Sequence, residues 1–273
     1  MNKKANWTVT LILIIGSLFI LFPLYLTVTV ALKTPWETGI SILGLPQAFH
    51  WENFTQAIVM TNFFRSFRNS FLITLGAVVL TLFSNSMVAY AIARNLEKKF
   101  FKLLYYYFLS AMFIPFAIIM LPVVKETSSL GIDNQIGLTF LYVVYGLAFN
   151  VFVYVAYIKS IPISLEEAAI IDGCGVWKLF WRIIFPLMGP VNATVGIITT
   201  VWVWNDFMLP LVILNKPETM TLPLVQFVFR TQFTTNYNLA FASYLMVMAP
   251  VILVYILAQK WIISGAIKGA VKN

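Results

Sequence analysis

Residues 9–32 read VTLILIIGSLFILFPLYLTVTVAL and contain no charged side chain. A helix of about 20 apolar residues crosses the hydrocarbon core of a bilayer, so this stretch predicts a membrane-spanning helix. It is longer than the apolar region of a removable signal peptide, and no small-residue cleavage site follows it. Because Lys3 and Lys4 precede it, we expect a retained helix that starts membrane insertion.

Five further stretches have the same apolar character. Their predicted bounds are 70–93, 101–121, 137–158, 189–212 and 240–261. Helices are favoured over strands because a lipid-exposed backbone must satisfy its hydrogen bonds within its own segment, and these runs lack the alternation of an outer-membrane barrel. Pro115 and Pro122 are expected to bend or end the third span.

The composition supports the same class. Apolar residues make up 60% of the chain and charged residues 10%, with a mean hydropathy of +0.88. A soluble domain is about a quarter charged. We therefore predict an all-α integral membrane protein of six transmembrane helices, folded as a single domain over residues 1–273.

The basic residues predict the orientation of the chain, because cytoplasmic segments carry an excess of Lys and Arg. With the N-terminus inside, the cytoplasmic segments hold Lys3, Lys4, Arg94, Lys98, Lys99, Lys102, Lys159, Lys178, Arg182, Lys260, Lys268 and Lys272. The outer segments hold Lys33, Arg65, Arg68, Lys125, Lys216 and Arg230. Twelve against six predicts a multi-pass protein with both termini cytoplasmic.

The counts of charged residues, cysteine and histidine disfavour nucleic-acid binding, an internal disulfide and a Cys/His metal site. The net charge of +8 is spread over connections rather than gathered into a patch interleaved with aromatic residues, so we expect no nucleic acid. The single cysteine, Cys174, excludes an internal disulfide, and the single histidine, His50, excludes a Cys/His metal cluster.

The cytoplasmic connection at 159–188 is the most informative loop and predicts a short helix, a glycine break and a second short helix. Ser164 with Glu167 three residues later matches a capping box, and Gly173 suits the left-handed position past a helix end. Apolar residues of the second piece fall at helical spacing: Val176, Leu179, Phe180 and Ile183. Two prolines are expected to break it before the fifth span: Pro186 and Pro190. The apolar stripe must pack against the protein's own helices, the lipid interface or a docked partner.

This loop resembles the EAA loop of ABC importer permeases, E-A-A-x3-G-x9-I-x-L-P. Glu167-Ala168-Ala169, Gly173, Ile183 and Pro186 match it, while Phe185 replaces the usual leucine. The run WNDF at 204–207 and the ending GAIKGAVK at 265–272 resemble carbohydrate-uptake permeases, in particular the second, six-span subunit of the maltose permease.

The resemblance implies a type I ABC importer fold, a place in a bacterial-type cell (inner) membrane, and a set of partners. These would be a second permease subunit, a cytoplasmic ABC ATPase dimer, an extracytoplasmic sugar-binding protein, a sugar and the lipid membrane. The coupling to the ATPase would use Glu167, Ala168, Ala169, Asp172, Gly173 and Pro186. Glu167 would pair with a basic residue there, with the capping box as its alternative role. The tail at 260–273 would reach the ATPase, or anchor to anionic lipid.

No catalytic site, metal site or cofactor is expected in this chain. It lacks a Gly-Lys pair and hence a Walker A loop, so ATP and magnesium would be bound by the partner ATPase.

Polar residues within a span are functional candidates. Asn205 and Asp206 would line a translocation pathway and hydrogen-bond sugar hydroxyls, with Trp202 and Trp204 stacking on sugar rings. Alternatively, the polar pair eases the helix toward a break at Pro210 or holds a neighbouring helix, and the tryptophans are interfacial anchors.

Other functions remain as alternatives. A secondary carrier tends to keep acids and histidines within the membrane, and a membrane enzyme needs a constellation of such groups; the spans show neither. An ABC importer for a non-sugar or glycerol-phosphate-type substrate is the third alternative.

Overall fold

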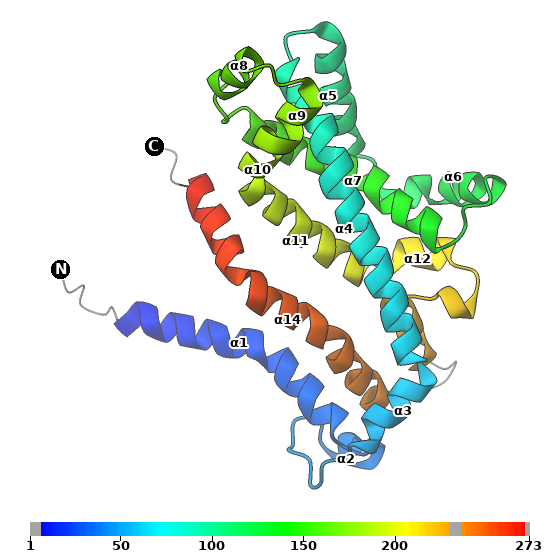
Figure 1. Ribbon diagram of the computed structural model, residues 1–273. Coiled ribbons are helices and arrows are strands. Elements are labelled where there is room, and N and C mark those ends of the chain that lie inside the picture. Colours follow the sequence, from blue (N-terminus) through cyan, green and yellow to red (C-terminus); the bar gives the residue numbers. More distant parts are fainter. Residues whose placement is uncertain (1–6, 230–235, 271–273) are drawn as a thin grey trace. The chain divides into compact units, whose positions relative to one another are not determined.

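The computed structural model describes residues 7–229 and 236–270, without the side chains of residues 254 and 257–270. Every regular element in this part is a helix (Figure 1). The longer helices are α1 (Trp7–Ala31), α4 (Phe63–Arg94), α5 (Lys99–Ala111), α6 (Phe116–Ser129), α7 (Gln135–Ile158), α11 (Gly189–Asn205) and α14 (Tyr237–Ala270). The shorter ones are α2 (Pro35–Ile40), α3 (Glu52–Met60), α8 (Ser164–Ile171), α9 (Val176–Leu179), α10 (Phe185–Leu187), α12 (Met208–Ile213) and α13 (Leu222–Val225). A π-helical turn covers Phe180–Ile184, and 3-10 turns cover Pro217–Thr219 and Gln226–Phe229.

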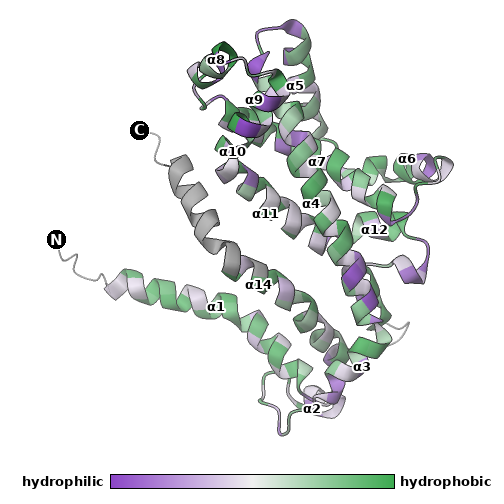
Figure 2. Cartoon of the chain, viewed as in Figure 1, coloured by the Kyte–Doolittle hydropathy of each residue, from purple (hydrophilic) through white to green (hydrophobic). Residues whose placement is uncertain are grey.

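Three of these helices are long and apolar enough to cross a membrane: α1, α4 and α7. The hydrophobic colouring of α1 is evident in Figure 2. Two bent pairs also qualify if each pair is one span, which gives up to five. The apolar part of α14 that the search covered is shorter, Tyr237–Leu253. The fold is therefore all-helical and membrane-spanning, and the count of six spans remains a prediction.

The third predicted span, 101–121, falls on two helices, α5 and α6, which meet at an angle of 104°. Pro115 precedes the first residue of α6, and its fixed φ and missing N–H favour the start of a new helix there. Pro122 lies inside α6. The expectation that prolines bend or end this span is confirmed for Pro115.

The fifth span also ends differently from its predicted bounds of 189–212. Its helix α11 stops at Asn205, and Asp206 takes an extended conformation before α12 begins. Pro210, expected to mark the break, lies inside α12. The chain is interrupted at Asp206 because its side chain accepts backbone hydrogen bonds that start α12.

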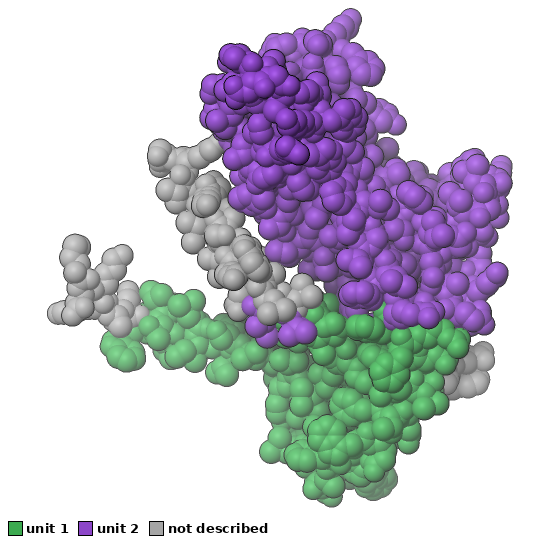
Figure 3. Space-filling model, in the orientation of Figure 1, with its two compact units in different colours: residues 1–67, 225–252 green, residues 68–224, 253–273 purple. Residues whose placement is uncertain are grey.

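The chain divides into two compact units (Figure 3). The first comprises residues 1–67 and 225–252, and the second comprises residues 68–224 and 253–273.

In the first unit, two asparagine side chains complete the end of α1. The last carbonyls of a helix have no partner within it. Asn53 Nδ2 donates to the carbonyls of Ala31 and Lys33, both at 2.9 Å. Asn238 Nδ2 donates to the carbonyls of Val30 at 2.9 Å and Lys33 at 2.8 Å. The start of α14 and the body of α3 are thus tied to one helix end.

In the second unit, α7 packs against α5, α11 and α12. One apolar core lies toward the residue 158 end of α7, and a second lies toward its residue 138 end. The first core includes residues from the loop at 159–188, so that this loop is built onto the same framework as the spans.

Candidate functional sites in the second unit and the pocket of the first

The loop at 159–188 forms the two short helices predicted for it, α8 and α9. Gly173 has a φ of +78°, which a residue with a Cβ adopts only with strain. Its N–H donates to the carbonyl of Ile170, and the N–H of Cys174 donates to that of Ala169, both at 2.9 Å. This pair of bonds is the Schellman motif that ends many helices. The predicted glycine bend is confirmed, with Asp172 as the exposed last residue before it.

The capping box predicted for Ser164 and Glu167 is wrong. Ser164 is the first residue of α8 rather than its cap, since Ile163 already has helical dihedral angles and no side-chain hydrogen bond caps the helix. Leu165 N donates to the carbonyl of Pro162, so the first turn starts at that proline. Glu167 is exposed, as is Ala168, whereas Ala169 is buried.

The acid that holds α8 in place is Glu166, which sequence reasoning missed. It is 7% exposed and accepts a hydrogen bond from Tyr90 Oη at 2.7 Å. Arg94 contacts Glu166 Oε1 through both Nε and Nη2 at 2.6 Å, and Nη2 also donates to the carbonyl of Ile161 at 3.1 Å. Glu166 precedes the buried Ala169 by three residues, so both lie on the face of α8 turned toward α4. That spacing was the available signal, but Arg94 had been read only as a topology charge.

The second helical piece buries some of its apolar residues in the protein core and exposes others on the surface. Leu179 and Phe180 are buried in the protein's own core and Ile183 is half-buried, but Val176 is exposed, contrary to its predicted place in the stripe. The reason is that the turn before α9 directs its first residues outward; Trp177 is likewise 71% exposed.

Pro186 does not break this helical piece. It is exposed and lies in α10, after a π-helical turn in which Phe185 N donates to the carbonyl of Phe180. The change of direction, 76°, comes at Met188 between α10 and α11. Pro190 is in the first turn of α11, where its missing N–H costs no helical hydrogen bond.

Exposed apolar side chains gather on α8 and α9. Ile171 is 85% exposed, and the others are Ile163, Leu165, Ile170, Val176 and Trp177. We call these six the loop patch. Of the three packing partners expected for the apolar residues of this loop, the protein's own helices account for one set of residues. The loop patch does not pack against them.

At the other end of α11, Asp206 has local partners. Its carboxylate accepts from Tyr142 Oη at 2.9 Å, from Met208 N at 3.1 Å and from Leu209 N at 3.3 Å. It thus joins α7 to α11 and starts α12. Asn205 Nδ2 donates to the carbonyl of Val201, one turn back, at 2.7 Å. These contacts fit the alternative in which the polar pair holds a neighbouring helix.

The two tryptophans lie in different surroundings. Trp204 is buried, whereas Trp202 is partly exposed and packs edge-on against Tyr142, with ring centroids 5.4 Å apart.

A cavity of about 250 Å³ lies between α7 and α11, and only Trp202 among the four predicted pathway residues lines it. The other lining residues are Tyr145, Gly146, Phe149, Asn150, Ile198 and Thr199. Asn150 and Thr199 were missed by sequence reasoning. Their signal was a polar side chain in the middle of an apolar span, which had been sought only near the end of the fifth.

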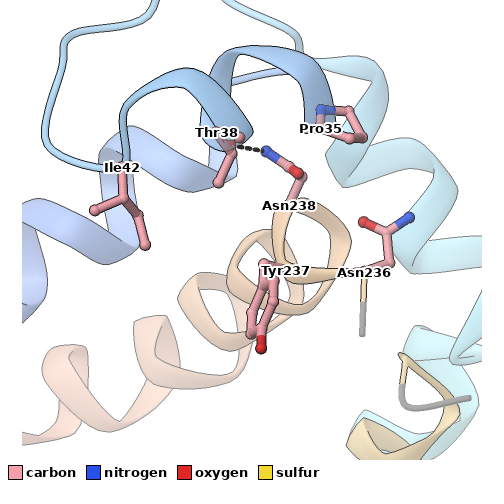
Figure 4. A pocket seen from close by; sticks show the side chains of 7 residues that line it. Pro35, Thr38, Ile42, Asn236, Tyr237 and Asn238 are labelled. Carbon is pink, nitrogen blue, oxygen red and sulfur yellow. Dashed lines mark hydrogen bonds between the residues drawn. The ribbon is translucent and has the colours of Figure 1, made fainter. Parts of the chain in front are cut away.

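A second pocket, of about 480 Å³, lies within the first unit (Figure 4). Its lining residues come from α2 and the start of α14: Pro35, Thr38, Gly39, Ile42, Asn236, Tyr237 and Asn238. Asn238 Nδ2 donates to Thr38 Oγ1 at 2.8 Å across it, as drawn in Figure 4.

No cluster of three or more His, Cys, Asp or Glu side chains that could hold a metal is found among the described residues. The side chains of the tail at 260–273 lie outside the described part of the chain.

Comparisons with known proteins all match this chain to membrane permeases of transport systems. Residues 85–268 match the family model described as binding-protein-dependent transport system inner membrane component. The chain is 38% identical to the multiple sugar-binding transport system permease protein MsmG of Streptococcus mutans, over 99% of each chain. It is 35% identical to the probable starch degradation products transport system permease protein AmyC of Thermoanaerobacterium thermosulfurigenes, over 98% of this chain and 97% of that one.

Among solved structures, the chain resembles one from a bacterial ABC transporter involved in the import of the acidic polysaccharide alginate. The TM-score is 0.82 at 21% identity, over 95% of this chain and 99% of that one. This likeness establishes the permease fold.

Proposed function

Because the chain belongs to the family of binding-protein-dependent transport system inner membrane components, we propose that it is one of two permease subunits of an ATP-driven oligosaccharide importer. As a member of that family it is a multi-pass inner membrane transport component and not a catalytic subunit. Several similar permeases are named for sugars, among them MsmG, AmyC and the melibiose/raffinose/stachyose import permease MelC of Bacillus subtilis. The proposed importer has a second permease, an ATPase dimer that binds ATP and magnesium, and an extracytoplasmic sugar-binding protein.

We propose that the six predicted spans form one type I permease domain with both termini in the cytoplasm. In this arrangement α5 with α6 counts as one broken span, α11 with most of α12 is the fifth span, and α14 supplies the sixth. The loop at 159–188 then faces the cytoplasm, where the ATPase is.

The observation that carries the coupling role is the exposed surface of that loop. Glu167, Ala168 and Asp172 are exposed beside the loop patch, while Glu166 and Ala169 fasten the opposite face of α8 to the protein. A short helix fastened in this way can transmit a displacement to the membrane helices, because the ion pair between Glu166 and Arg94 holds α8 to α4. The loop patch supplies apolar area for a cleft in the ATPase, and Glu167 supplies a charge for a basic residue there. Pro186, which is exposed on α10, belongs to the same proposed coupling segment.

The test is purification of the tagged chain from native membranes in mild detergent, followed by identification of co-eluting proteins and an ATPase assay. Co-elution with an ATPase and a second permease is expected for the wild type. Glu167→Gln keeps the size of the side chain and removes its charge, so ATP hydrolysis should become uncoupled from uptake while the complex still forms. Glu97→Gln, an exposed acid outside the loop, is the matched control. Elution without an ATPase, or normal uptake by Glu167→Gln, would contradict the coupling role.

For Asn205, Asp206 and Trp204 we keep the pathway role as a proposal alongside their structural contacts. Alanine variants of Asn205 and Asp206 separate the two, since a lining role predicts altered uptake at unchanged amounts of importer in the membrane. A helix-joining role for Asp206 predicts loss of the folded protein instead.

A further inference from the structure

The cavity between α7 and α11 is lined in part by buried polar side chains. Asn150 is 2% exposed and Thr199 is 3% exposed, and both line the cavity. Within the described residues, neither side chain forms a hydrogen bond with another protein group. Buried polar groups are nearly always hydrogen-bonded, so these two side chains must find their partners in what fills the cavity. A ligand with hydroxyl groups can take the place of water there and supply both hydrogen bonds.

The cavity exists in part because Gly146 has no side chain. A Cβ at Gly146 would lie 2.9 Å from Asn150 Nδ2, 3.6 Å from Asn85 Nδ2 and 3.8 Å from a ring atom of Trp202. The missing side chain therefore leaves room for the amide and for whatever occupies the cavity. On each helix the lining residues include pairs three or four positions apart, such as Gly146 with Asn150 and Ile198 with Trp202, which places them on one side of the helix.

The chemistry of the lining defines the class of ligand. No lining residue carries a carboxylate, ammonium or guanidinium group. An ionised ligand would remain uncompensated there, and burying an isolated charge is far more costly than burying a hydroxyl. The rings of Trp202 and Tyr145 offer apolar faces, while Asn150 and Thr199 offer hydrogen bonds. A neutral sugar has an apolar ring face and a hydroxyl-bearing edge, so it matches both. The volume of about 250 Å³ is large enough for one sugar ring.

We infer that this cavity is a binding site for one ring of an uncharged saccharide in the translocation pathway, formed by this subunit through Asn150, Thr199 and Trp202. The inference rests on the proposed importer function and deepens it. It excludes from this site the phosphorylated and carboxylated sugars that the family membership alone leaves open. It also places the sugar contact one to two turns away from Asn205 and Asp206, whose polar groups have protein partners.

The experiment uses the whole importer in proteoliposomes with saturating binding protein, and measures uptake of radiolabelled raffinose and maltotriose. Thr199→Val removes a hydroxyl at nearly constant volume, and Asn150→Leu does the same for the amide. Thr199→Ser keeps the hydroxyl. Thr81→Val is the matched control, because Thr81 is also fully buried and its hydroxyl lacks a partner, but it does not line the cavity.

Thr199→Val and Asn150→Leu should each lower the uptake of the neutral sugar five- to tenfold, which corresponds to roughly 1–1.4 kcal/mol. Thr199→Ser and Thr81→Val should stay within twofold of the wild type, with equal amounts of assembled importer throughout. Trigalacturonate, an acidic probe, should not be transported.

Three results would overturn the inference. One is wild-type uptake by both cavity variants in an intact importer. The second is loss of the second permease from both variants, since the two side chains would then be contacts between subunits. The third is transport of trigalacturonate that Thr199→Val reduces. The proposed function itself would be overturned if the wild-type chain did not elute with an ATPase. Co-elution therefore separates failure of the proposed function from failure of this inference.

Discussion

The contact of Arg94 with Glu166 is expected to fix α8 to the rest of the protein. Arg94→Gln leaves the carboxylate of Glu166 nearly buried, with Tyr90 as its one remaining donor among the described contacts. Breaking a buried ion pair by removing one partner costs about 3–5 kcal/mol. The side chains of Arg94 and Glu166 are 14% and 10% exposed, so water compensates part of this. We expect a loss of about 2–3 kcal/mol in the free energy that keeps α8 docked.

Local opening of α8 is the measurable consequence. A loss of about 2.8 kcal/mol raises an opening equilibrium about a hundredfold, at 1.4 kcal/mol per tenfold. Amide hydrogen exchange of residues 164–174, followed by mass spectrometry in detergent, should accelerate by that factor in Arg94→Gln. Lys98→Gln, which removes an exposed cation just before α5, should leave exchange within about twofold, since exposed substitutions are usually worth under 0.5 kcal/mol.

A double-mutant cycle decides whether the contact itself is responsible. Glu166→Gln alone leaves the guanidinium facing an amide, while the pair Arg94→Gln with Glu166→Gln removes both charges. The double variant should cost less than the sum of the single ones by at least about 1 kcal/mol. Strict additivity, or unchanged exchange in Arg94→Gln, would refute the reasoning.

Three further predictions concern the local structure of the chain. Gly173→Ala should destabilise the loop by about 1–2 kcal/mol because of its positive φ, whereas Gly175→Ala, at φ −72°, should not; exchange of residues 164–179 measures both. Gly146→Ala should raise the melting temperature of the purified chain less than Gly196→Ala does, because its Cβ would lie 2.9 Å from Asn150 Nδ2 and displace that amide. Gly196→Ala, whose Cβ would meet only contacts of 3.8 Å or more, should be neutral or stabilising, and equal effects of the two would contradict this. Hydrogen bonds from the backbone N–H groups of Thr34 and Gln47 to its carboxylate hold the pKa of Glu37 below its usual 4.5. The stability that Glu37 contributes is therefore complete above pH 4.5 and is lost as the pH falls through the lower pKa of the folded state. Melting curves between pH 3 and 7 should show this loss in the wild type, and a similar slope in Glu37→Gln would count against it.

Much of the architecture was accessible from the sequence, because lipid imposes a simple requirement of length and apolarity. The predicted spans 9–32 and 137–158 agree with α1 and α7 to within two residues. The second span was predicted to start at residue 70, yet α4 starts at Phe63, since a helix can continue past the apolar region into polar surroundings. Apolarity alone also could not reveal the bend between α5 and α6.

The functional residues were predictable to a different degree. Gly173 was identified because a glycine after a short helix has few physical explanations. Glu166 was missed, because its role depends on Arg94, which lies 72 residues earlier in the chain. Asn150 and Thr199 were missed for the same reason: a shared cavity between two helices is not visible in either segment alone.

The two asparagines at the end of α1 have a consequence for the order in which the protein is made. Ribosomes deliver α1 first, but Asn238, which supplies two of the four hydrogen bonds that asparagine side chains donate to the carbonyls of residues 30–33, belongs to α14. During synthesis the carbonyls of Val30 and Lys33 therefore lack these donors until residue 238 has been made. We expect truncated chains without α14 to keep only the donors from Asn53 and the nearby backbone at this helix end.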